Sequence, residues 1–340
     1  MKIIIILIIA FLFFLSKNKK MHQIAILLLS YFFANRNIKV PDTIPYMDMY
    51  ELGTDYLGAE EAFLKLCEFA NGLGLSFVVF LFILTFITLE IWYFCTKCLF
   101  GENAVSWMAI LLFSYFGVYY LGAVLRSSIG IAICYLGMTV LLKKGFKLWP
   151  VVIYYALVFI SYSIQQSTAL FLIAPLALFS LKDKYLYIIT TCALVLCVSS
   201  TVLPINDLLL NISAFMGSTR FNYYTDLDLT IGVKVFDLFL MIIGYIAIYS
   251  RKQFENYTFY KYYTFFLHLY VYALLVLSLV NNIPAGARLA MNWLYFEFVL
   301  VYFLVFKSNI IKTSKGFVAF IIVAFSLFMH FHSYPLFLEY

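Results

Sequence analysis

Residues 73–94 read LGLSFVVFLFILTFITLEIWYF and contain a single charged side chain. A helix needs about 20 apolar residues to cross the hydrocarbon core of a bilayer. In that core the backbone N–H and C=O groups find no water, so they must bond within the segment, as an α-helix allows. The stretch therefore predicts a transmembrane helix.

Similar apolar runs fill most of the chain, each bounded by charged residues or by Pro, Gly and Asn. Four of them are short, so we expect ten to twelve spans. The strict apolar/polar alternation of a membrane β-barrel is missing. The sequence predicts an all-α, polytopic integral membrane protein with a single transmembrane domain over residues 1–340. The runs cover residues 2–16, 21–35, 73–94, 104–125, 127–142, 148–164, 168–181, 185–203, 231–250, 263–281, 289–306 and 316–332.

The composition excludes most other classes of protein. Of the 340 residues, 65% are hydrophobic and 12% are charged, and the mean hydropathy is +0.97. A soluble domain averages about 45–50% apolar and about 25% charged residues. An ordinary cytosolic enzyme, a disordered chain and a small disulfide scaffold are therefore excluded. The run after Lys2 has no small-residue cleavage site, so we expect it to be a retained first span.

Basic residues set the expected orientation of the spans. If the connection with Lys17, Lys19 and Lys20 lies in the cytoplasm, 15 of the 23 basic residues fall on the inner side. This arrangement satisfies the positive-inside rule. The two long loops, about 36–72 and 204–230, are then external, so any activity is expected at the outer face of the membrane. Short inner connections argue against cytosolic substrates such as ATP or nucleotide sugars, and no nucleic-acid partner is expected.

Arginine and lysine do not distribute alike in this map. Most lysines are inside, whereas four of the five arginines lie at the outer boundary: Arg36, Arg126, Arg220 and Arg288. The positive-inside rule acts on both residue types, so it does not explain the difference. Arginine differs in having a planar fork that grips phosphate in a bidentate manner. The outer arginines predict a phosphate or diphosphate site; the alternative is that they snorkel, cap helices or pair with acids.

The neighbours of three of these arginines strengthen the prediction. Arg126 and Ser127 open a span, where the free amides of a helix N-terminus favour anions. Arg288 opens a later span after Pro, Ala and Gly, which let a ligand approach closely. Arg220 lies in the second external loop near Tyr223, a mixture of cation and aromatic ring that suits a sugar phosphate. The tyrosines there are equally typical of an interfacial aromatic belt.

The first external loop interleaves acids with aromatic residues. Such mixtures are common in carbohydrate sites, where an acid binds sugar hydroxyls and a ring packs on the sugar face. A carboxylate there can act as general base toward a sugar hydroxyl, and Asp42 and Glu60 are the candidates. The alternative is a solvated acidic loop. Neither external loop holds His and acids at metal-ligand spacing, so no metal or other cofactor is expected.

The order of these features resembles the EpsG-type group of Wzy-like polysaccharide polymerases over roughly residues 30–295. Three positions depart from the pattern of that group. Ser127 stands where the group has Gln, Gln165 and Gln166 stand where it has His, and Ala287 stands where it has Glu. The matching features are Arg36, the Asp42-Thr43 pair with Tyr46, the Glu60-Glu61-Ala62-Phe63 step, Leu125-Arg126-Ser127-Ser128-Ile129-Gly130, and Ala287-Arg288-Leu289.

The resemblance implies a GT-C-like membrane glycosyltransferase that joins repeat units of an O-antigen or exopolysaccharide. The growing chain would leave undecaprenyl diphosphate and join another lipid-linked unit at the outer face of the bacterial inner membrane. Arginines would stabilise the charge of the leaving diphosphate, with Arg36, Tyr46, Gln165, Gln166, Ser127 and Tyr223 binding substrate. The implied partners are the lipid-linked oligosaccharide, the bilayer, a chain-length regulator and a flippase.

Two other functions fit parts of the sequence. A flippase or other transporter would suit twelve spans, but such proteins often carry internal repeats and bind substrate at mid-membrane. Here the charges gather at the outer boundary and no repeat is visible. An O-antigen ligase would share the external arginines. The sugars, the linkage formed and the oligomeric state are not encoded in any recognisable motif.

Overall fold

The computed structural model describes residues 2–16, 18–114, 116–199, 235–280, 287–311 and 314–333. These residues are almost entirely helical and contain no β-strand, which confirms the all-α prediction. The second external loop, with Arg220 and Tyr223, lies outside the described residues. Two compact units are present: one combines residues 1–172 with 312–340, and the other covers residues 173–311.

The described residues include five helices that are long and apolar enough to cross a membrane: Phe77–Phe100, Leu125–Lys144, Tyr260–Val280, Arg288–Lys307 and Lys315–His332. Four shorter apolar helices accompany them: Lys2–Leu15, Glu102–Phe113, Leu148–Ile164 and Gln166–Leu178. The chain is therefore a polytopic membrane protein. The total of ten to twelve spans stays a prediction, as do the single domain and the GT-C-like architecture.

The first unit contains most of the N-terminal helices and the last one. Neighbouring contacts join α1 to α2, α2 to α5, α5 to α8, α8 to α9 and α6 to both α1 and α17. The helices are α1 (Lys2–Leu15), α2 (Lys19–Ala34), α3 (Thr43–Leu52), α4 (Glu61–Gly72), α5 (Phe77–Phe100), α6 (Glu102–Ser114), α7 (Phe116–Gly122), α8 (Leu125–Lys144), α9 (Leu148–Ile164) and α17 (Lys315–Ser333), with the short 3₁₀ turn η1 (Gly53–Asp55) after α3.

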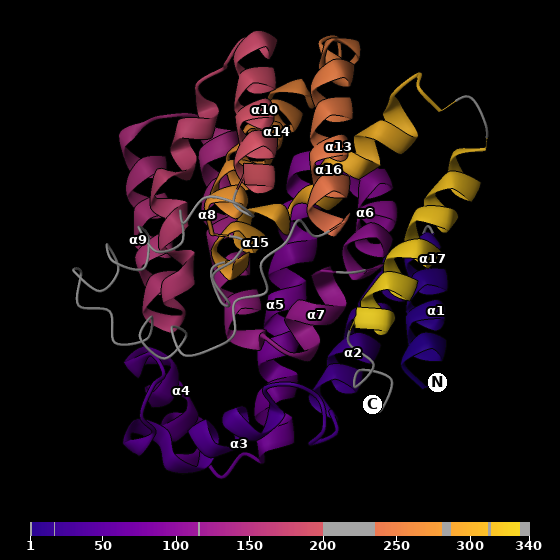
Figure 1. The fold of residues 1–340 in the computed structure, drawn as a ribbon. Helices are drawn as coiled ribbons and strands as arrows, with labels where there is room; N and C mark the ends of the chain where they lie inside the picture. The colour runs from indigo at the N-terminus through magenta and orange to yellow at the C-terminus, as the bar shows by residue number, and fades with distance from the viewer. Residues whose placement is uncertain are drawn as a thin grey trace. The chain divides into compact units, whose positions relative to one another are not determined.

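The first external loop of the prediction is folded into helices. Figure 1 shows α3 and α4 packed side by side at one end of α5. Helix α5 begins at Ser76, whose hydroxyl accepts the Val79 N–H, and its 24 residues extend about 36 Å at 1.5 Å per residue. At its far end Lys97 pairs with Glu102 at 2.7 Å, and Lys19 pairs with the same carboxylate at 3.0 Å. The lysines and the α3–α4 segment thus occupy opposite ends of this unit.

Helices α8 and α9 pack at very close range because of two glycines. A Cβ added at Gly137 would lie 3.1 Å from Tyr154 Cδ2 and 3.5 Å from the Tyr154 backbone. A Cβ added at Gly130 would lie 3.1 Å from Ser161 Oγ of α9, and 2.9 Å from Thr168 Cγ2 in the segment that follows α9. The Tyr154 hydroxyl donates to the Phe171 carbonyl, which ties α9 to the segment that follows it.

That following segment, η2 (Gln166–Leu178), is a 3₁₀ helix of 13 residues. Such helices are uncommon beyond three or four residues, but each residue rises about 2.0 Å instead of 1.5 Å. Thirteen residues therefore extend about 26 Å, close to the hydrocarbon thickness of about 30 Å. A run that is too short to span as an α-helix nearly reaches across in this form.

The second unit holds α10 (Asp183–Ser199), α13 (Val235–Ser250), the 3₁₀ turn η3 (Arg251–Phe254), α14 (Tyr260–Val280), α15 (Ala287–Leu294), α16 (Glu297–Tyr302) and the π-helical turn η4 (Phe303–Lys307). Helix α14 contacts α10, α13, α15 and α16, so it is the core of this unit. The expected span 289–306 is interrupted at Tyr295 and Phe296, between α15 and α16.

We predict that Gly137→Leu destabilises the protein. The added side chain must push apart α8 and α9, and overpacking of this kind costs about 1–3 kcal/mol. Thermal unfolding in detergent, followed by size-exclusion chromatography, measures the change. Gly72→Leu is the matched control, because a Cβ at Gly72 has nothing within 4 Å. Equal melting temperatures for both variants would contradict the close packing of these helices.

Candidate functional site

Arg126 is held by groups from three other segments at the α3–α4 end of the first unit. Its Nη1 lies 2.5 Å from Glu60 Oε2, and the two side chains are 18% and 3% exposed. Glu60 immediately precedes α4, and its second oxygen, Oε1, accepts the backbone N–H of Gln166 at 3.0 Å. One carboxylate thus links the first turn of α8, the start of α4 and the start of η2.

Aromatic rings enclose the same guanidinium. Arg126 Cζ lies 5.6 Å from the centre of the Phe63 ring and 6.0 Å from that of Tyr46. These two rings meet edge to face at 6.0 Å. The Arg126 backbone N–H donates to the Tyr46 hydroxyl at 3.0 Å. Burial raises the pKa of Tyr46 above its usual value, so the phenol keeps its proton and retains an O–H to donate.

The remaining donors of Arg126 suit an anion. Its Nε is buried and has no hydrogen-bond partner within the described part of the chain. A buried donor left without a partner costs free energy, and a phosphate oxygen would satisfy it. Ser127 and Ser128, both buried, follow Arg126 in the first turn of α8, where the helix dipole also favours negative charge. The anion site at Arg126 stays a prediction, and the buried Nε and the N-terminus of α8 support it.

Hydrogen bonds through Ser161 and Thr168 hold the Gln165–Gln166 turn against α8. The Ser161 hydroxyl lies 2.8 Å from the Gly130 carbonyl and 2.9 Å from Thr168 Oγ1, while Thr168 donates to the Gln165 carbonyl at 2.8 Å. Gln165 Nε2 lies 3.2 Å from Ser167 Oγ. These bonds position the backbone N–H that Glu60 accepts, and they leave the Gln166 side chain exposed.

Arg36 contributes to the architecture of the site. It is 8% exposed, and its three nitrogens donate to the carbonyls of Phe33 at 3.1 Å, Gly122 at 2.8 Å and Leu121 at 2.9 Å. These carbonyls end α2 and α7, where the helix dipoles are negative and the last C=O groups lack helical partners. Its guanidinium also lies 5.8 Å from the centre of the Tyr46 ring. Arg36 therefore caps two helices and supports Tyr46.

Asp42 occupies the position before α3 in a left-handed conformation, with φ of 63° and no side-chain capping bond. Left-handed backbone is tolerated by Asp more readily than by most residues. The half-buried carboxylate acts on Tyr46 electrostatically. Among the described residues, the carboxylate that pairs with Arg126 is that of Glu60. Its predicted role as base stays a prediction.

Of the four predicted outer arginines, Arg126 and Arg36 lie in one described site, and Arg220 lies outside the described residues. The structure brings together Arg126, Glu60, Tyr46, Gln166 and Arg36 within the first unit. Arg288, exposed in the first turn of α15, belongs to the second unit.

The sequence motif contains Phe63 but does not predict the packing of its ring against the Arg126 guanidinium. The spacing of Phe63 is the available clue, because three residues after Glu60 place it one helical turn further along α4.

Arg251 in the second unit provides a comparison for Arg126. It donates to the Leu181 carbonyl at 2.7 Å, to Asp183 Oδ1 at 3.0 Å, to Ser180 Oγ at 2.8 Å and to the Tyr260 hydroxyl at 3.2 Å. Every nitrogen of this buried guanidinium is used. It is a structural tie between the connection before α10 and the turn before α14.

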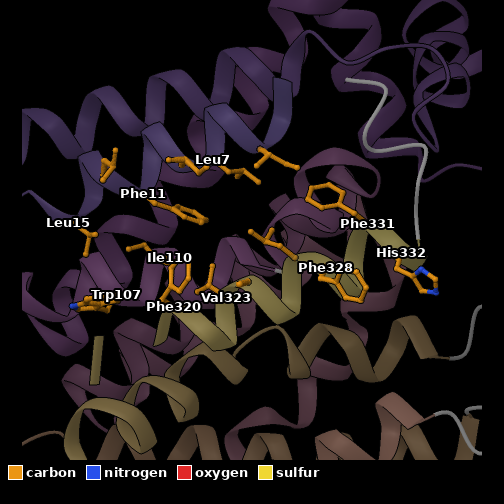
Figure 2. A pocket seen from close by; sticks show the side chains of 15 residues that line it. Leu7, Phe11, Leu15, Trp107, Ile110, Phe320, Val323, Phe328, Phe331 and His332 are labelled. Carbon is orange, nitrogen blue, oxygen red and sulfur yellow. The ribbon is translucent and has the colours of Figure 1, made fainter. Parts of the chain in front are cut away.

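Two concave regions lie elsewhere in the first unit. A polar pocket of about 360 Å³ lies between α3 and α4 and includes Glu51, Asp55 and Glu68. An apolar groove of about 670 Å³ runs between α1, α6 and α17. Figure 2 shows Leu7 and Phe11 on one wall, and Phe320 and Phe328 on the other. The groove walls suit hydrocarbon chains. Within the described ranges of the chain, no three side chains of His, Cys, Asp or Glu lie together in a way that could hold a metal ion.

We predict that Arg36→Ala lowers the melting temperature, because it leaves three helix-terminal carbonyls without their donor. Hydrogen bonds to charged groups contribute about 1.5–3 kcal/mol each. Arg36→Lys should recover only part of the loss, since an ammonium cannot reach three divergent carbonyls. The control is Lys39→Ala, an exposed cation of the same loop. An unchanged melting temperature with lost activity would instead support direct substrate binding by Arg36.

Comparison with known protein families identifies the family of this chain. The profile of the EpsG family matches residues 19–340, nearly the whole chain. No curated protein and no solved structure matches the sequence. The EpsG family is of the Wzy-like polymerase type, and this chain belongs to it.

Proposed function

We propose that this protein is a polysaccharide repeat-unit polymerase that transfers a growing glycan from undecaprenyl diphosphate to another lipid-linked repeat unit. The family supports polysaccharide polymerisation at a general level. The observation that carries the specific proposal is Arg126, a mostly buried cation whose Nε has no protein partner in the described residues. A diphosphate is the ligand that such a partly used fork fits best.

The reaction requires charge stabilisation more than any other assistance. A hydroxyl of the acceptor sugar attacks the anomeric carbon of the donor, and the bond from that carbon to the diphosphate oxygen breaks. The diphosphate leaves with the bonding electron pair and gains one negative charge. Arg126 would stabilise this charge from a site with few competing water molecules, where such interactions are strong. Arg288 and Arg220 are proposed to bind the same lipid-linked substrates.

The location of the site fits chemistry at the outer membrane face. Arg126 lies at the opposite end of the first unit from Lys19 and Lys97, because α5 and α8 separate the two ends. Lysines gather on the cytoplasmic side of membrane proteins, so the Arg126 end would face outward. Lipid-linked repeat units are polymerised on that side, which requires no nucleotide substrate.

We predict that Arg126→Ala stalls surface polysaccharide at a single repeat unit. Loss of one charge-stabilising donor typically lowers kcat about 10²–10³-fold, enough to remove a ladder on a gel. Arg126→Lys should recover little activity, because a point charge does not replace the bidentate fork. Arg288→Ala and Arg220→Ala are expected to stall in the same way. The measurement is gel analysis of glycan from a deletion strain that expresses each variant.

Lys65→Ala serves as the control for these variants. Lys65 is a cation of α4 that is 65% exposed and pairs with Glu61, so its loss should leave the ladder intact. Normal ladders in all of the arginine variants would contradict the diphosphate site. In the deletion strain itself, polymer that accumulates on the carrier would indicate a ligase, and units trapped at the cytoplasmic face would indicate a flippase.

A further inference from the structure

The ion pair between Arg126 and Glu60 places an acid and a cation side by side at the proposed substrate site. Glu60 Oε2 is 2.5 Å from Arg126 Nη1, and the Glu60 side chain is 3% exposed. The pair leaves Arg126 Nε available. A diphosphate bound through that side of the fork would therefore share one guanidinium with the carboxylate.

We propose that Glu60 is the general base of the transfer. When Glu60 takes up the proton, its attraction for Arg126 weakens, and Arg126 interacts more strongly with the leaving diphosphate. The inference rests on the proposed function. It decides between the two carboxylates that the sequence offers as candidate bases: Glu60 contacts the guanidinium of Arg126 directly, whereas Asp42 does not share that contact.

The charges balance through the step. The acceptor O–H bond breaks and its proton goes to the Glu60 carboxylate, while the oxygen forms a bond to the anomeric carbon. The bond from that carbon to the diphosphate breaks, and its electron pair stays on the diphosphate oxygen. Glu60 loses one negative charge as the diphosphate gains one, so the total charge facing Arg126 is constant.

This exchange makes the stabilisation by Arg126 specific to the transition state. Before reaction, the Glu60 charge competes for the cation and repels the diphosphate. As the proton moves, the competing charge disappears and the interaction of Arg126 with the leaving oxygen strengthens. Only interactions that are stronger in the transition state than in the ground state accelerate the reaction. A merely structural ion pair would have no such effect.

The two roles predict opposite changes for Glu60→Gln. If Glu60 is a base whose charge competes for Arg126, its replacement should make the purified protein bind farnesyl diphosphate about fivefold more tightly or better. The rate of polymerisation should fall about 10²–10⁴-fold. As a structural support alone, its removal would release Arg126 and weaken binding. Isothermal titration calorimetry in detergent, with melting temperatures to verify folding, measures the affinity.

A second variant keeps the test decisive. Glu60→Ala should regain part of its polymerisation rate in added formate, because a small carboxylate can replace the missing base. The matched control is Glu61→Gln: the neighbouring acid is 76% exposed and pairs with Lys65 on the surface of α4, so affinity and rate should not change. Equal or weaker diphosphate binding in Glu60→Gln, or no rescue by formate, would overturn the proposal.

Failure of the inference is distinct from failure of the proposed function. If Arg126→Ala loses diphosphate binding and polymerisation while Glu60→Gln retains both, Arg126 remains the diphosphate site and Glu60 is not the base. If the wild-type protein binds no diphosphate and Arg126→Ala polymerises normally, the proposed function itself is contradicted.

Discussion

The ion pair between Arg126 and Glu60, at one end of the first helical unit, is the interaction on which the rest of the site depends. A cation in apolar surroundings needs charge compensation and hydrogen bonds, because desolvation alone costs several kcal/mol. Glu60 supplies the charge, and Phe63 and Tyr46 supply ring faces. Glu60 is itself fixed by the Gln166 N–H. The α3–α4 segment, the start of α8 and the α9–η2 turn are thereby joined at one point.

The number of guanidinium nitrogens that bond to the protein distinguishes structural arginines from a candidate ligand-binding arginine. Arg36 and Arg251 donate from all three of their nitrogens to groups of the protein. Arg126 pairs through Nη1 and has a buried Nε with no protein partner in the described ranges. The arginine segregation seen in the sequence therefore combines two physical roles. Helix capping explains Arg36, whereas anion binding is the better interpretation of Arg126.

The helical architecture and part of the site could be predicted because both depend on simple local rules. Apolar runs bounded by charged residues predict the helices. The position of Arg126 at the start of a span predicts that it lies at one end of a helix. The α3 helix could not be forecast in the same way, because Thr43–Leu52 mixes acids with aromatics and its apolar residues do not favour one face. Two of the three carbonyl partners of Arg36 come from residues 85 and 86 positions away, a tertiary relation with no sequence signal.

The central claim is that this chain itself forms the glycosidic bond and releases the diphosphate carrier. The most direct measurement is reconstitution of the purified protein in liposomes with lipid-linked single repeat units. The account predicts a ladder of products, with one undecaprenyl diphosphate released for each bond formed, and loss of both in Arg126→Ala. Folded wild-type protein that yields neither ladder nor released carrier, or an Arg126→Ala variant that yields both at the wild-type rate, would contradict it.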